Sequence, residues 1–141
     1  MEAALQALYR AIYARLSRPG ALWGSRVYAD LASANAQRPY VVFFWAGGGE
    51  ANTRRHADAE LLLTVKIISE RQAEAFQGAG RLAELLNDAG VYDSADPLDG
   101  GPDWVICTTT QERAVHLVEL IDGARVYHEG FQLRVVMEAA G

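Results

Sequence analysis

One apolar run constrains the fold more than any other feature of the sequence. Residues 40–45, YVVFFW, are all β-branched or aromatic and carry no charge. Such residues favour extended backbone, and a continuous apolar run is typical of a strand covered on both sides. We therefore expect a central strand here that is buried on both faces. Three glycines, Gly47, Gly48 and Gly49, follow at once, and we expect residues 46–58 to form a polar loop.

Two segments have the apolar spacing of amphipathic helices. Residues 2–17 place leucine, isoleucine and tyrosine at helical intervals, and Pro19 ends the pattern. A second helix is expected to start at Ser69, which forms a capping-box pattern with Gln72, and to run to about residue 88. The long segment 88–103, rich in Asp, Gly and Pro, predicts a surface loop that is functional or flexible.

Strands are expected before and after the second helix. From the Asp122-Gly123 pair we predict a tight hairpin turn whose register places His116 opposite Glu129. A second such pair, Glu129-Gly130, predicts another turn before the last strand. Besides residues 40–45, the expected strands are at 26–28, 60–69, 104–109, 113–121, 125–128 and 131–138.

The order of these elements predicts an α+β fold, a mainly antiparallel β-sheet with two helices packed on one face. The 141 residues suit a single domain, 1–141, because half are hydrophobic and 22% are charged. The net charge of −5 argues against broad nucleic-acid binding, which needs a basic face. There is no signal-peptide pattern and no apolar stretch near the roughly 20 residues of a membrane span, so we expect a cytoplasmic protein without membrane contact.

The residues that could carry chemistry do not form a recognisable active site. The glycines at 47–49 lack the lysine of a P-loop and the third glycine of a dinucleotide fingerprint. His116 with Glu129 reads as a structural pair, with His128 beside it, and the single cysteine, Cys107, reads as a buried apolar residue. We therefore predict a protein that is not an enzyme and needs neither a metal nor a cofactor.

Aromatic residues and arginines favour protein–protein contacts. Twelve of the thirteen basic residues are arginines. The aromatic residues near the expected element ends are Tyr9, Tyr13, Trp23, Tyr28, Trp45, Tyr92, Trp104 and Tyr127. We assign residues 46–58 to a loop that contacts a neighbouring subunit or partner. Its candidate contact residues are Gly47, Gly48, Gly49, Glu50, Arg54 and Arg55.

The sequence resembles the tail terminator, or tail completion, proteins of long-tailed, siphovirus-like bacteriophages. The resemblance spans nearly the whole chain, from LQALYRAIYARLS through RVYADL, RPYVVFFW and SERQAEAFQGAGRLAELLN to VYHEGFQLRVVME. The RVY…PYVVF segment and the closing H-x-G-x-x-x-R-V pattern carry most of it. The loop 88–103 and the second closing hairpin are longer than the minimal pattern of the family.

The resemblance implies a structural virion protein. Such proteins form a homo-oligomeric ring, usually a hexamer, on the head-proximal end of the tail tube. The ring ends tube polymerisation and offers a docking surface to the head–tail connector or stopper protein, and DNA passes through its lumen. Assembly takes place in the host cytoplasm. The alternatives are another neck or minor tail protein, a small cytoplasmic adaptor, or a nucleotide-binding domain that uses Gly47–Gly49.

Overall fold

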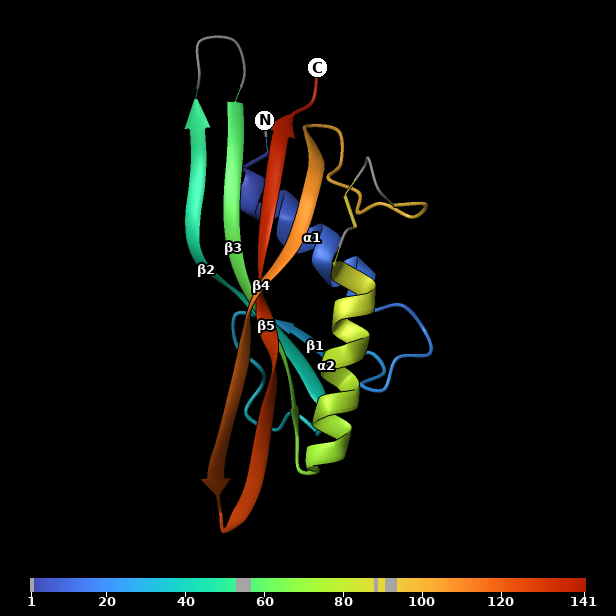
Figure 1. Ribbon diagram of the computed structural model, residues 1–141, viewed down its shortest axis with the longest axis vertical. Coiled ribbons are helices and arrows are strands. Elements are labelled where there is room, and N and C mark those ends of the chain that lie inside the picture. The colour runs from blue at the N-terminus through green and yellow to red at the C-terminus, as the bar shows by residue number, and fades with distance from the viewer. Residues whose placement is uncertain (1, 53–56, 88, 91–93) are drawn as a thin grey trace.

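The computed structural model of the chain describes residues 2–52, 57–87, 89–90 and 94–141. Within these residues, two helices, α1 (Ala4–Leu16) and α2 (Gln72–Leu86), pack on one face of a five-stranded sheet (Figure 1). The predicted α+β class and the position of both helices are confirmed. In the described part of the chain, no helix has the length and apolar character that crossing a membrane requires.

The sheet is mainly antiparallel, as the sequence predicts. Its order is β1-β2-β3-β5-β4; β1 runs parallel to β2, and the remaining neighbours are antiparallel. β5 therefore lies between β3 and β4, although it comes last in the chain. The strands are β1 (Val27–Ala29), β2 (Tyr40–Asn52), β3 (Ala57–Ser69), β4 (Trp104–Ile121) and β5 (Ala124–Ala139).

Alternation along β3 separates the two faces of the sheet. Leu61, Leu63, Val65 and Ile67 are at most 2% exposed and join the main core under the helices. Each such side chain contributes about 1.5–3 kcal/mol through burial. The other face of the sheet carries a smaller apolar cluster of three buried residues, Val42, Ile68 and Val126. From the sequence, Thr64 and Lys66 on the second face of residues 60–69 predict that this face is only partly covered, and the prediction is confirmed.

The predicted loop at 46–58 is wrong where the structure describes it. Residues 46–52 continue β2, and residues 57 and 58 already belong to β3. A register shift between Trp45 and Gly47 marks a β-bulge. The strand is also not buried on both faces, because Trp45 is 50% exposed. Glycine did not end the strand here because the hairpin supplies hydrogen-bonding partners on β3 all the way to Asn52.

The capping box predicted at Ser69 is also wrong. Ser69 is the last residue of β3, and α2 begins only at Gln72. The Ser69 hydroxyl accepts a hydrogen bond from the Arg71 amide (3.1 Å) and donates one to Glu74 Oε1 (2.7 Å). This hydroxyl, with Arg71, holds the pKa of the Glu74 carboxyl below its usual value. Ser69 thus connects the strand to the first turn of the helix.

The last part of the sheet contains one hairpin rather than two. The Asp122-Gly123 turn is confirmed: both residues have positive φ angles, 52° and 80°, and His116 pairs with Glu129. The second predicted turn, at Glu129-Gly130, is wrong because β5 runs through it without a break. Gly130 has a packing role, since a Cβ there would lie 2.0 Å from the Val65 carbonyl oxygen. The two strands expected at 104–109 and 113–121 form the single strand β4, with two register shifts.

Candidate assembly surface

The β4–β5 hairpin projects beyond the helices as a two-stranded arm (Figure 1). We call residues 116–129 of this arm the hairpin tip. Four large apolar side chains of the tip are exposed: Leu117 (47%), Val118 (42%), Leu120 (73%) and Ile121 (36%). Exposed apolar side chains that gather on a projecting segment are typical of protein–protein contact sites.

Two histidine–glutamate pairs brace the hairpin tip. His116 Nδ1 contacts Glu129 Oε1, and His128 Nε2 lies 2.5 Å from Glu119 Oε1. Burial, aided by the nearby Lys66 ammonium, lowers the pKa of His128 below its ordinary value. The described residues contain no cluster of three potential metal ligands. The structural pair predicted for His116 is therefore present, and a second pair holds the same two strands together.

A groove lies between the first half of α1 and the middle of β2. Its volume is about 500 Å³, and it is lined by Ala3, Leu5, Gln6, Tyr9, Asp30 and Trp45. We call it the Trp45 groove. Strand β1 pairs with β2 only at residues 41–43, so within the described chain the rest of β2 has no strand neighbour on this side. Such an open edge offers unpaired backbone groups to a partner.

Tyr9 fixes the floor of the Trp45 groove. Its hydroxyl donates a hydrogen bond to Asp30 Oδ1 (2.5 Å) and accepts one from the Trp45 backbone amide (2.8 Å). Burial and the bond to Asp30 raise the pKa of Tyr9 to about 12. Trp45 Nε1 donates to the Gly47 carbonyl oxygen at 2.6 Å, which holds the indole beside the groove. The groove is thus built on fixed side chains.

The predicted contact residues fall into two groups. Gly47, Gly48, Gly49 and Glu50 lie within β2, close to the Trp45 groove, and the Glu50 carboxylate accepts a hydrogen bond from the Ala4 amide of α1. Arg54 and Arg55 lie outside the described residues. The sequence missed the groove itself, because its walls come from α1 and from β2, which are far apart in the chain.

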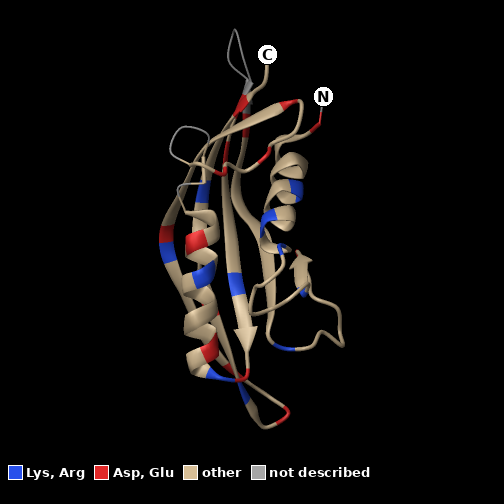
Figure 2. Cartoon of the chain, turned by 90° about the vertical axis from the view of Figure 1, so that its right-hand side faces the viewer, with Lys and Arg blue, Asp and Glu red and all other residues tan. Residues whose placement is uncertain are grey.

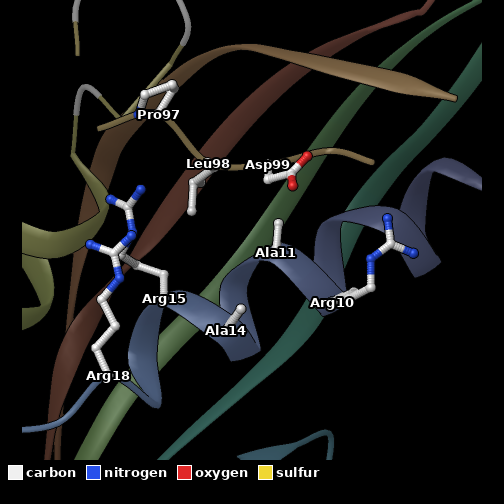
Figure 3. Close-up of a pocket in the computed structure, with 8 residues that line it drawn as sticks. All are labelled: Arg10, Ala11, Ala14, Arg15, Arg18, Pro97, Leu98 and Asp99. Carbon is white, nitrogen blue, oxygen red and sulfur yellow. The ribbon is translucent and has the colours of Figure 1, made fainter. Parts of the chain in front are cut away.

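A cavity of about 270 Å³ lies between α1 and residues 97–99 (Figure 3). Its arginines are already engaged, so it is not a free anion site. The buried Arg15 donates to the carbonyl oxygens of Leu85 (2.9 Å) and Asp96 (2.6 Å). Arg18 forms an ion pair with the Asp96 carboxylate, and Arg10 forms one with Glu2. These contacts fasten the described part of the 88–103 segment to α1. Two arginines on α1, a third just after its end and an acidic loop were the sequence signal for this arrangement.

The end of the molecule that carries both termini is acidic (Figure 2). Asp58 pairs with Glu138 across neighbouring strands, and the Glu2 amide donates a hydrogen bond to Asp103. The hairpin tip, at the other end, exposes four large apolar side chains. The two ends of the molecule therefore present different chemistry to their surroundings.

No protein-family model and no curated protein matches the sequence. Among solved structures, the chain is similar to a chain from the structure entitled "Virion of native gene transfer agent (GTA) particle". The TM-score is 0.65 at 19% sequence identity, and the similarity covers 100% of both chains. The two chains therefore share a fold over their whole length.

Proposed function

We propose that this protein is a structural component of a phage-like virion. In this proposal it forms a ring on the head-proximal end of the tail tube, ends tube polymerisation and offers the docking surface for the head connector. The observation that carries the proposal is the fold shared, over the full length of both chains, with a protein in the structure of a gene transfer agent virion. The resemblance of the sequence to tail terminators supports the finer assignment.

The surface of the subunit supports an assembly role. The exposed leucines of the hairpin tip and the open edge of β2 would be aggregation hazards on a protein that works alone. In a ring, neighbouring subunits cover such surfaces. The proposed contacts to a neighbour or to the tail tube remain Gly47, Gly48, Gly49, Glu50, Arg54 and Arg55.

The geometry does not favour the nucleotide-binding alternative. A phosphate site of this kind needs glycine backbone amides that converge on the anion at the start of a helix. Here Gly47, Gly48 and Gly49 pair with Leu62, Leu61 and Glu60 inside a hairpin. Their backbone is paired with β3 in the sheet and does not open a helix.

Tube assembly in the presence of the protein tests the proposal. A tail-tube protein from the same genome is polymerised with and without this chain, and tube length and tube ends are examined by negative-stain electron microscopy. We expect rings in native mass spectra and tubes that are shorter and closed by a ring at one end. Tubes of unchanged length that carry no added protein would overturn the terminator assignment.

The same preparation separates the alternatives. Binding to the connector without binding to the tube indicates another neck protein, whereas a one-to-one complex with an unrelated protein indicates an adaptor. A nucleotide-binding domain would instead show a rise in melting temperature with ATP or NAD, because a ligand of the folded state stabilises it.

A further inference from the structure

We propose that the hairpin tip of one subunit docks in the Trp45 groove of a second copy of this chain. The inference rests on the proposed function, because it names the contact through which the ring would close. The tip lies at the end of the molecule away from the termini, whereas the groove lies beside the first turns of α1 (Figure 1). The tip of one chain therefore cannot fill the groove of the same chain.

The glycines beside the groove point to a segment that approaches closely. Gly48 is required by the fold, because its φ is +82° and a Cβ would lie 2.1 Å from the Glu60 carbonyl oxygen. Gly47 and Gly49 have no such requirement, since a Cβ at either position meets nothing within 4 Å. Glycine weakens a strand and often marks a place where another backbone comes near. A docked hairpin explains both residues.

The apolar character of the two surfaces matches. Val118 and Leu120 project from the tip with 42% and 73% of their surface exposed. The groove offers Leu5, the half-exposed Trp45 indole and a volume of about 500 Å³. An aromatic side chain in a pocket is a common anchor of protein–protein contacts.

The charges at the two surfaces are complementary. Arg125 pairs with Leu120 across the hairpin and has no ion-pair partner among the described residues. Asp30, at the groove, accepts a hydrogen bond from the Tyr9 hydroxyl and likewise has no cationic partner in the described chain. Docking would bring an unpaired cation to an unpaired anion, which favours this register over others.

A second copy is the occupant that these features favour. A contact between tip and groove uses two different surfaces, and such heterologous contacts generate rings when the rotation closes. A symmetric contact between two tips would instead bring Arg125 near Arg125 and leave both grooves empty. The tip-to-groove contact gives each subunit one donor surface and one acceptor surface.

Two variants and their mixture test the contact. Leu120→Asp places a charge on the tip, and Gln6→Arg fills the groove with a side chain of the same charge as Arg125; both positions are exposed. Each variant alone should be monomeric in native mass spectra. An equimolar mixture should give dimers and no rings. The intact tip of the Gln6→Arg variant can dock in the intact groove of the Leu120→Asp variant, whereas the reverse contact joins two altered surfaces.

Matched controls exclude nonspecific effects of the substitutions. Leu31→Asp changes another exposed leucine, and Gln77→Arg changes another exposed helical glutamine. Both controls should keep wild-type rings, and all four variants should keep the wild-type circular dichroism spectrum. A further variant that carries both Gln6→Cys and Val118→Cys should give disulfide-linked ladders under oxidation. The native Cys107 should not take part, because it is buried and burial raises the pKa of its thiol.

The outcomes separate this inference from the proposed function. Wild-type rings that persist in both variants, or a mixture that stays monomeric, would overturn the contact alone. A Leu120→Asp variant that keeps its rings but no longer binds tube protein would also overturn it, because the tip would then dock on the tube. A wild-type chain that stays monomeric in the presence of tube protein would overturn both.

Discussion

The Glu50 carboxylate accepts a hydrogen bond from the Ala4 backbone amide, with 2.7 Å between Oε1 and N. Ala4 is the first residue of α1, and the N-cap residue, Ala3, has no side chain that could accept this bond. The first amides of a helix lack partners within the helix, and the helix dipole favours an anion there. The strand β2 thus supplies the cap that the helix sequence lacks.

Loss of this cap should destabilise the protein. We expect Glu50→Ala to lower the free energy of unfolding by about 1 kcal/mol, the usual effect of removing an N-cap acceptor. Urea unfolding followed by circular dichroism measures the change. Glu84→Ala is the control, because Glu84 forms only an exposed helical ion pair with Arg81 and should change stability by less than about 0.5 kcal/mol. Equal losses in the two variants would contradict a capping role.

The three consecutive glycines should respond differently to alanine. Gly48→Ala is expected to cost about 2 kcal/mol or more, because the left-handed backbone and the contact with the Glu60 carbonyl both resist a Cβ. Gly47→Ala and Gly49→Ala should be neutral or stabilising by about 0.5 kcal/mol in the isolated subunit. Thermal unfolding of the three variants checks this order, and a loss at Gly47 as large as at Gly48 would disprove it.

Arg15 should hold the described part of the 88–103 segment in place. Arg15→Ala leaves two carbonyl oxygens without their donor, and we expect a loss of about 1–3 kcal/mol. Limited proteolysis should cut residues 94–103 faster in this variant. Arg18→Ala, which removes only an exposed ion pair, should be cut at nearly the wild-type rate. Similar cleavage rates in both variants would contradict a special role for Arg15.

His128 should make stability depend on pH. Its pKa in the folded protein is lowered by burial, so below the ordinary value of about 6.5 the unfolded chain takes up a proton more readily. The contribution of the neutral His128 side chain to the free energy of unfolding is fully present above pH 6.5 and is lost as the pH falls toward the pKa of His128 in the folded protein. Urea unfolding at pH 7.5 and 5.5 should show a smaller decrease in stability for His128→Gln than for wild type. The same decrease in both would exclude this origin.

Arg54 and Arg55 lie outside the described residues, and the prediction for them comes from the sequence. Because the segment around them is polar, we expect the double variant Arg54→Ala, Arg55→Ala to fold normally but to assemble less well. Melting temperature and ring yield in native mass spectra measure the two effects. A clear fall in melting temperature with unchanged assembly would contradict the prediction.

The sequence predicted those features of the fold that depend on neighbouring residues. The helix at α1, the alternation along β3 and the Asp122-Gly123 turn each follow from a local pattern and are confirmed. The errors arose where a distant segment decides the outcome. From the sequence, Gly48 and Gly130 indicated breaks in a strand, yet each lies within one. Glycine is needed at both positions because the backbone of the neighbouring strand leaves no room for a Cβ.

The candidate surface was predictable only in part. The sequence marked Gly47–Glu50 as contact residues and Trp45 as a conspicuous aromatic residue, and both border the groove or lie close to it. It did not reveal that α1 forms the other wall. The bond between Tyr9 and Asp30 joins residues 21 positions apart, and neither residue has a pattern that would indicate the other.

The central position of β5 has a consequence for biosynthesis. Of the five described strands, β5 is the last to be translated, yet β3 and β4 both hydrogen-bond to it along their length. While the ribosome is still making β5, β4 has no partner, and the apolar core face of β3 is incomplete. The sheet can close only after Ala139 has emerged from the exit tunnel. Until that moment only β1, β2 and β3 can pair with one another, and the long-range contacts of β5 with β3 and β4 form last.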